Sequence, residues 1–138
     1  MATPRDISRL NASLPPFMAL LNGQIESYDQ DTQEATLGFD VPEQYCHSGD
    51  IVQGGFITVM LDSAMSHAVF ACDDTVLTLS SLEISTRYLE VTRAGALVAK
   101  GRIVRLSHKT AFLESWLFST DGKLLATAQS VAKIHRKR

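Results

Sequence analysis

The sequence has little cysteine. Its 138 residues include only Cys46 and Cys72, and no CxxC spacing is present. Two isolated thiols do not form a disulfide framework, and no group of Cys, His and acidic residues has a recognised metal-ligand spacing. We therefore expect no metal site.

An excess of charge of one sign is also missing. The formal net charge is −2 with the histidines neutral, so no overall field attracts nucleic acid. The one basic cluster, KIHRKR at positions 133–138, lies at the end of the sequence. We interpret it as a solvated tail rather than a binding patch, and we expect no nucleic-acid partner.

No long uninterrupted hydrophobic run is present. Four polar residues interrupt the longest apolar segment, namely Asp62, Ser63, Ser66 and His67, so we expect no membrane span. The first ten residues, MATPRDISRL, lack the apolar core of a secretory signal. The expected location is the cytoplasm.

The composition is that of an ordinary folded domain. Hydrophobic residues make up 45% of the chain and charged residues 20%. This length suits a single hydrophobic core, and neither a repeat nor a linker interrupts it. We predict one domain over residues 1–138.

The first third of the chain predicts a short helix followed by a hairpin. Two prolines at positions 15 and 16 favour a helix start that continues to Leu21, and Gly23 is a plausible stop. Two strand-like runs within 24–41 flank a polar turn, and Pro42 ends the second run. Residues 43–53 are expected to form an irregular loop.

The segment from Gly54 to about Cys72 predicts a buried helix. Its apolar residues occur all around a helical wheel instead of forming one stripe. At this length, without proline and with several Ala and Met residues, helix is favoured over strand. A helix that is apolar on most sides is usually enclosed by the rest of the protein.

Strand patterns follow this helix. The runs lie at 76–91, 96–107, 110–120 and 123–135, and an Asp-Gly hairpin signal separates the last two. Small residues on one face of the last run would let a helix approach the sheet closely. We expect a hairpin, the buried helix and then a three-stranded antiparallel run, which makes five strands and an α+β domain. One chain of this size does not easily cover such a helix, so we also expect an oligomer.

The junction between loop and helix resembles that of the hotdog-fold acyl-CoA thioesterases of the phenylacetic-acid-pathway type. These proteins carry an Asn in the loop, then His-Gly-Gly at the helix start and an Asp or Glu eight residues after the first Gly. The corresponding positions here are His47, Gln53, Gly54, Gly55 and Asp62. The resemblance covers nearly the whole chain. It implies a curved antiparallel sheet wrapped around a long central helix, and an acyl-CoA substrate. Such a reaction needs no metal or redox cofactor, because coenzyme A is part of the substrate.

The residue types suit thioester hydrolysis. Backbone N–H groups at a helix N-terminus are unpaired and carry the positive end of the helix dipole. Gly54 and Gly55 let a thioester carbonyl approach those groups without a side chain in the way. Asp62 would act as a general base on water or attack as a nucleophile. An apolar setting should raise the pKa of its carboxyl group.

Helix geometry limits how these groups work together. Eight residues separate Gly54 from Asp62, which is about 12 Å along a helix. One carboxylate therefore does not easily meet a carbonyl held by its own glycines. The resembled family solves this with a dimer, in which the acid of one subunit faces the glycine N–H groups of the other. We expect a homodimer, or a homotetramer built as a dimer of dimers.

Two flanking positions depart from the family pattern. His47 stands where the family has its loop Asn, and Gln53 stands where it has His before the glycines. Both replacements can donate a hydrogen bond. Ser66 lies one turn after Asp62 and is a candidate to orient the carboxylate or a water molecule. The family also places a Ser or Thr on the following strand, which aligns with Ser81, with Ser80 as the competitor.

Further positions are candidates for contacts with the substrate. Arg105, His108 and Lys109 lie near a strand turn and could meet the phosphates of coenzyme A, or they form an ordinary solvated turn. We expect the acyl group in an interface pocket lined by residues such as Phe56, Met60 and Met65. Two alternatives are a non-catalytic acyl-CoA or lipid-binding hotdog module and a hotdog hydratase or dehydratase, whose motif we do not find. An interaction or scaffold protein ranks last.

Overall fold

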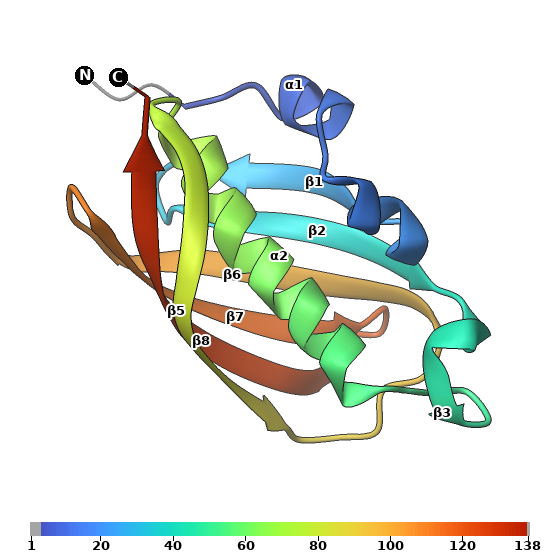
Figure 1. The fold of residues 1–138 in the computed structure, drawn as a ribbon. Helices are drawn as coiled ribbons and strands as arrows, with labels where there is room; N and C mark the ends of the chain where they lie inside the picture. Colours follow the sequence, from blue (N-terminus) through green and yellow to red (C-terminus); the bar gives the residue numbers. More distant parts are fainter. Residues whose placement is uncertain (1–3, 138) are drawn as a thin grey trace.

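The protein folds as one curved antiparallel sheet around a long helix. The computed structural model describes residues 4–137. Six strands form the sheet in the order β1-β2-β6-β7-β8-β5, and every neighbouring pair is antiparallel. In Figure 1 the sheet curls around α2, and the N-terminal segment lies beside the same helix. The elements are α1 (Ile7–Ala12), η1 (Pro16–Leu21), β1 (Gln24–Asp29), β2 (Glu34–Val41), η2 (Glu43–Tyr45), β3 (Cys46–Ser48), β4 (Ile51–Val52), α2 (Gly54–Cys72), β5 (Val76–Tyr88), β6 (Gly95–Leu106), β7 (Thr110–Ser119) and β8 (Leu124–Arg136).

Helix α2 supplies the centre of the hydrophobic core. It has 19 residues, and ten of them are buried, including Met60, Leu61 and Ala64. By length and composition alone α2 could cross a membrane, but here the sheet packs against it. The wheel of apolar residues in the sequence is therefore explained by the sheet that wraps this helix.

The closest approach of helix and sheet occurs at Gly101 on β6. A Cβ atom added at this glycine would lie 2.2 Å from the carbonyl carbon and oxygen of Ala64 on α2. Backbone atoms do not yield to such an overlap, so only glycine allows this packing. The sequence suggested the small residues of β8 as the place of close approach, but the tightest contact is on β6.

The predicted α+β architecture is confirmed, while the number of strands is corrected. The hairpin of β1 and β2 and the helix α2 form where the sequence predicts them. After α2, all four strand-like runs form strands, so the sheet has six strands and not five. The run at 124–136 is a full strand that pairs with both β7 and β5.

One local prediction before α2 was wrong, while the predicted short helix is confirmed. Residues 43–53, expected as an irregular loop, contain η2 and the short pair β3–β4. The helix predicted up to Leu21 is a 3₁₀ helix, and the left-handed Asn22 ends it before Gly23. A separate helix, α1, precedes it, where Asp6 caps the N-terminus by accepting a hydrogen bond from the Ser8 amide.

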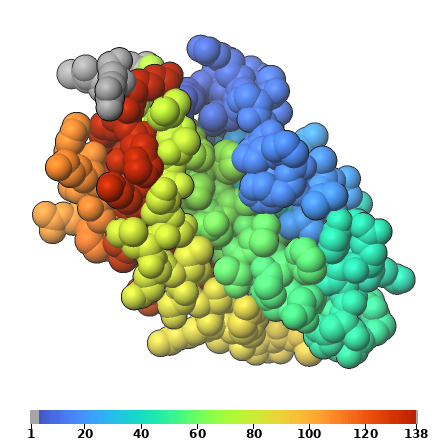
Figure 2. Space-filling view, viewed as in Figure 1, coloured from blue at the N-terminus to red at the C-terminus, as the bar shows by residue number. Residues whose placement is uncertain are grey.

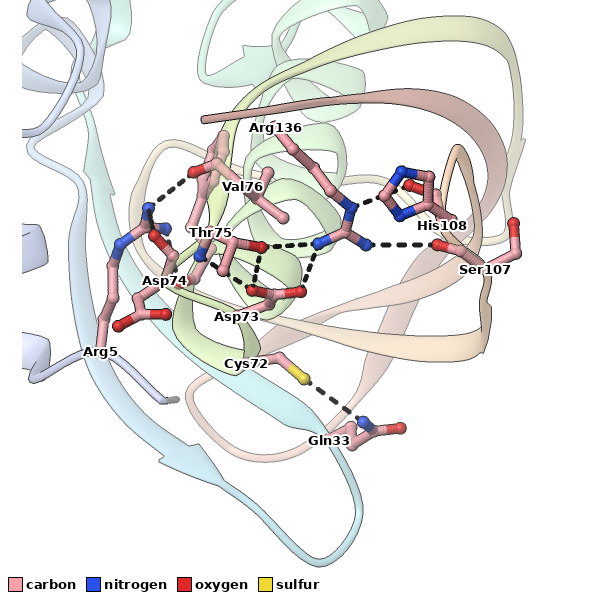
Figure 3. A network of polar contacts seen from close by, with 11 residues as sticks. Arg5, Gln33, Cys72, Asp73, Asp74, Thr75, Val76, Ser107, His108 and Arg136 are labelled. Carbon is pink, nitrogen blue, oxygen red and sulfur yellow. Dashed lines mark hydrogen bonds and ion pairs between the residues drawn. The ribbon is translucent and has the colours of Figure 1, made fainter. Parts of the chain in front are cut away.

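The basic C-terminal cluster is not a solvated tail over residues 133–137, and position 138 lies outside the described residues. Ile134 is buried, and Arg136 belongs to β8. The Arg136 guanidinium lies 2.7 Å from the Asp73 carboxylate, which follows α2 and is itself buried. Figure 3 shows this pair beside Arg5, which donates to one carbonyl in the last turn of α2, that of Phe70, and to the carbonyls of Asp74 and Val76 after it. Both arginines therefore fix the C-terminal end of α2.

Candidate active site at the start and middle of α2

The first two amides of α2 are free to bind a ligand. Gln53 precedes the helix, and its carbonyl oxygen accepts hydrogen bonds from the amides of Phe56 and Ile57. Within residues 4–137, the amides of Gly54 and Gly55 have no hydrogen-bond acceptor. Two unpaired N–H groups at a helix N-terminus are suited to stabilise negative charge on an oxygen atom.

The two glycines have different surroundings. A Cβ atom added at Gly54 would lie 3.1 Å from the hydroxyl oxygen of Tyr88 and 3.2 Å from the adjoining ring carbon. At Gly55 no atom lies within 4 Å of such a Cβ. An alanine at position 54 would therefore have to displace Tyr88 by a few tenths of an ångström, whereas Gly55 borders open space.

Tyr88, at the end of β5, holds the first peptide of the helix. Its hydroxyl donates a hydrogen bond of 2.9 Å to the Gly54 carbonyl and lies 3.1 Å from the Thr58 hydroxyl. Thr58 is in turn 2.9 Å from Thr86 on β5. Tyr88 was not among the residues predicted for the site, because a contact between residues 34 positions apart leaves no local pattern in the sequence.

Asp62 lies on the half-buried side of α2 that faces β5. Its carboxylate accepts a hydrogen bond of 3.4 Å from the Ser81 hydroxyl. Burial raises the pKa of Asp62, and the bond from Ser81 opposes this without cancelling it. The pKa of Asp62 is therefore shifted in the direction that the sequence predicted. The competitor Ser80 lies instead 3.1 Å from the His135 ring.

The unpaired amides and the acid do not meet within one chain. Both Gly54 and Asp62 belong to the same uninterrupted helix, eight residues apart. That spacing corresponds to about 12 Å along the axis. One chain therefore carries the hydrogen-bond donors and the carboxylate at two separate places on the helix.

The remaining polar candidates stand at the surface or beside the acid. His47 is exposed on β3, and its Nδ1 atom lies 2.9 Å from the Ser48 hydroxyl. Gln53 is exposed at the helix start, where its side chain caps nothing. Ser66 is half-buried one turn after Asp62, but the hydroxyl bonded to Asp62 belongs to Ser81.

The basic candidates lie at the other end of α2. Arg105 is exposed on β6, while His108 and Lys109 are exposed in the turn that leads to β7. This turn adjoins Arg136, whose Nε atom donates to the His108 carbonyl, as Figure 3 shows. Arg136 also pairs with Asp73 beyond the end of α2. In one chain, these side chains are therefore not brought to the Gly54 amides.

The three apolar candidates fall into two groups. Met60 and Met65 have no exposed surface and belong to the core, so in the single chain they line no open pocket. Phe56 is half-buried and packs against Tyr45, with 4.6 Å between the ring centroids. Of the predicted lining, only Phe56 stands beside the free amides.

The curved antiparallel sheet around the long helix α2 is an α+β fold of the hotdog type. The sequence model of the thioesterase superfamily matches residues 49–126, which include both Gly54 and Asp62. The chain belongs to the thioesterase superfamily. No curated protein matches the sequence.

Solved structures share the whole architecture. A phenylacetic acid degradation-related protein from Ralstonia eutropha JMP134 is 25% identical with a TM-score of 0.84, over 94% of this chain and 99% of that one. A mutant thioesterase from Pseudomonas aeruginosa is 24% identical with a TM-score of 0.85, over 98% and 97%. A Streptococcus mutans UA159 protein bound to acetyl-CoA is 18% identical with a TM-score of 0.74, over 85% and 91%. The last two likenesses concern the fold alone.

Proposed function

We propose that this protein is an acyl-CoA thioesterase whose active site is completed by a second copy of the chain. Membership of the thioesterase superfamily supports hydrolysis of a thioester. The structural neighbour bound to acetyl-CoA supports coenzyme A as the thiol part of the substrate. The proposed reaction requires no metal and no redox cofactor.

One observation carries the proposal. The unpaired amides of Gly54 and Gly55 stand at the start of α2, and an acid of raised pKa stands two turns further on. Free amides stabilise the oxyanion that forms when a thioester carbonyl is attacked. A carboxylate with a raised pKa is a better base than an ordinary aspartate. The oxyanion donors and the base that acyl transfer needs are both present in one chain, but they lie at separate places on α2.

A partner subunit would bring the donors and the base together. Strand β5 is an edge of the sheet and has neighbours on one side only. Its side chains Leu77 and Leu82 are 60% and 65% exposed, and the Asp62–Ser81 contact lies beside this edge. Exposed apolar residues on an open edge strand favour association with another chain. The proposed dimer brings Gly54 and Gly55 of one subunit to Asp62 of the other.

The chemistry follows from this arrangement. The amides of Gly54 and Gly55 donate hydrogen bonds to the carbonyl oxygen as negative charge develops on it. Asp62 takes a proton from water while the water oxygen bonds to the carbonyl carbon. The C–S bond then breaks, and the proton passes from Asp62 to the departing thiolate. In the alternative route the carboxylate attacks the carbonyl carbon itself, and the C–S bond breaks to release the thiolate. Water then cleaves the mixed anhydride, which releases the acid and restores the Asp62 carboxylate.

The surrounding polar residues receive supporting roles in this proposal. Ser81, and secondarily Ser66, orient the carboxylate of Asp62 or its water molecule. His47 and Gln53 offer hydrogen-bond donors near the helix start. Arg105, His108 and Lys109 are proposed to meet the phosphates of coenzyme A.

The test is a thiol-release assay with purified protein and acyl-CoAs of varied chain length and aromaticity. We expect hydrolysis by the wild type and a loss of about 10²–10⁴-fold in kcat for Asp62→Asn. Asp40→Asn on β2 is the matched control, because Asp40 is exposed and belongs to the opposite half of the sheet. Full activity of Asp62→Asn and Asp62→Ala would contradict the mechanism.

A non-catalytic acyl-CoA or lipid-binding module is the second candidate. The observation that favours it is the replacement of the loop Asn and the helix-start His of the family by His47 and Gln53. Tight binding of acyl-CoAs without turnover across the same panel would support this candidate. Restoring both family residues, as His47→Asn and Gln53→His, should then create measurable hydrolysis.

A further inference from the structure

A hollow in the surface lies beside the C-terminal half of α2. It has a volume of about 920 Å³ and is bounded by α1, by α2 and by the beginning of β5. Figure 2 shows α2, in green, between the blue N-terminal segment and the yellow-green β5. Leu10, Phe70 and Leu77 provide apolar walls, and charged residues of both signs also line it, namely Arg5, Asp6, Arg9, Asp74 and Lys137. We call this hollow the α1 cleft.

His67 contributes an unused hydrogen-bond acceptor to the α1 cleft. The residue lines the cleft and is only 5% exposed. Its Nδ1 atom lies 2.8 Å from the Ser63 carbonyl oxygen, so Nδ1 carries the ring hydrogen. Burial lowers the pKa of His67 against the opposing effect of the Ser63 bond, so the ring is neutral. Its Nε2 atom then has a free lone pair.

Nothing in the described part of the chain donates a hydrogen bond to this Nε2 atom. Within residues 4–137, Nε2 is not one of the buried unpaired side-chain atoms, so it reaches the open space of the cleft. The Arg5 guanidinium, which also lines the cleft, is not a donor to Nε2, because it donates to the carbonyls of Phe70, Asp74 and Val76. A donor group on a bound molecule would satisfy His67.

The α1 cleft lies within reach of the proposed active site. His67 follows Asp62 by five residues, which is about 7.5 Å along the helix and about 140° around it. Ser66 and Phe70 occupy the helix surface between them, and Phe70 already lines the cleft. An acyl chain that extends roughly 12 Å from a carbonyl at Asp62 would place its far end beside His67.

We propose that the α1 cleft binds the distal end of the acyl group and that His67 Nε2 accepts a hydrogen bond from a hydroxyl there. The preferred substrates are medium-chain thioesters with a terminal hydroxyl group. This inference rests on the proposed thioesterase function and names its substrate class. A neutral imidazole nitrogen is an acceptor only, so it favours a hydroxyl over a terminal methyl or carboxylate.

The test compares two thioesters of equal length, ω-hydroxydecanoyl-CoA and undecanoyl-CoA. We expect the wild type to prefer the hydroxylated substrate by roughly tenfold in kcat/KM, the effect of one hydrogen bond. His67→Leu should abolish or reverse this preference, while His67→Gln, whose amide oxygen also accepts, should retain part of it. His135→Leu is the matched control, because His135 lies outside the cleft lining.

The outcomes separate this inference from the proposed function. Equal rates for both thioesters in the wild type would overturn the substrate class but leave thioesterase activity standing. A preference for an ω-carboxydecanoyl thioester would also overturn it, because Arg9 and Lys137 would then be the determinants. If the wild type hydrolyses no thioester, the proposed function fails. Calorimetric binding of the same two compounds to wild type and His67→Leu then decides the role of His67.

Discussion

The Tyr88 hydroxyl donates a hydrogen bond of 2.9 Å to the Gly54 carbonyl, at the first residue of α2. This carbonyl and the Gly55 N–H belong to one planar peptide unit, so fixing one orients the other. Tyr88 therefore positions a proposed oxyanion donor without touching the substrate carbonyl. It links the edge strand β5 to the hydrogen-bond donors at the start of the helix.

The first prediction concerns removal of this hydroxyl. Tyr88→Phe should lower kcat by about 2–10-fold, the effect of one hydrogen bond, with little change in KM. Steady-state kinetics on a hydrolysed acyl-CoA measures both constants. Tyr28→Phe, at the opposite edge of the sheet, is the matched control. If both variants retain the wild-type kcat, Tyr88 has no positioning role.

The second prediction separates the two glycines. Gly55→Ala meets no neighbouring atom, so it should preserve the free energy of unfolding or raise it by up to about 1 kcal/mol through helix propensity. Its methyl group should nevertheless crowd a bound carbonyl and lower kcat/KM. Gly54→Ala should reduce both stability and activity, because its methyl group would lie 3.1 Å from the Tyr88 hydroxyl.

Urea unfolding and steady-state kinetics test this pair of variants together. Adding Tyr88→Phe to Gly54→Ala removes the nearest atom and should recover part of the lost stability. A Gly55→Ala variant with undiminished turnover would show that the open space at Gly55 does not receive the substrate carbonyl.

The sequence predicted the architecture because the relevant signals are periodic and long. The apolar wheel of residues 54–72 required an enclosing sheet, and the structure has one. The strands of the second half follow alternating patterns of ten residues or more. By contrast, β3 and β4 have three and two residues, which is too short for a periodic pattern.

The candidate site was only partly predictable. The spacing of Gly54, Gly55 and Asp62 is local and could be read directly from the sequence. Tyr88 and His67 were missed as functional candidates because their roles depend on which strand and which cleft lie beside α2. Gly101 had a usable signal, since a glycine inside a strand often marks the close approach of another backbone.

The third prediction concerns the pH dependence of hydrolysis. Burial raises the pKa of Asp62, and only the ionised carboxylate acts as a base. The acid limb of kcat/KM should therefore lie at higher pH than for an ordinary aspartate. Ser81→Ala removes the bond that lowers this pKa, so the limb should shift further upward. Ser80→Ala is the control, because Ser80 faces His135 instead. Superimposable profiles for wild type and Ser81→Ala would refute the assignment.

The fourth prediction concerns how the raised pKa of Asp62 affects the pH dependence of stability. A carboxyl group whose pKa is higher in the folded state binds its proton more tightly there, so stability falls as pH rises through the folded-state pKa. Asp62→Asn removes the cost of burying the charge and should raise Tm at neutral pH by a few degrees at most. The difference should disappear at acid pH, where Asp62 is protonated. Calorimetry across this range would contradict the prediction if Asp62→Asn were less stable at neutral pH.

The last prediction concerns the ion pair between Asp73 and Arg136 at the C-terminal end of α2. Burial raises the pKa of Asp73, but hydrogen bonds from Arg136 and Thr75 outweigh it, so the net pKa is lowered. Such a group stabilises the fold above its unfolded-state pKa, and this contribution is lost as pH falls through the folded-state pKa.

Arg136→Met leaves the buried carboxylate without its cation and should cost about 3–5 kcal/mol at neutral pH. Lys123→Met, which breaks an exposed pair with Glu90, should cost less than about 1 kcal/mol. Urea unfolding at neutral and acid pH measures both variants, and the penalty of Arg136→Met should shrink as Asp73 becomes protonated. Equal penalties for the two variants would mean that the Asp73–Arg136 pair behaves as an ordinary surface contact.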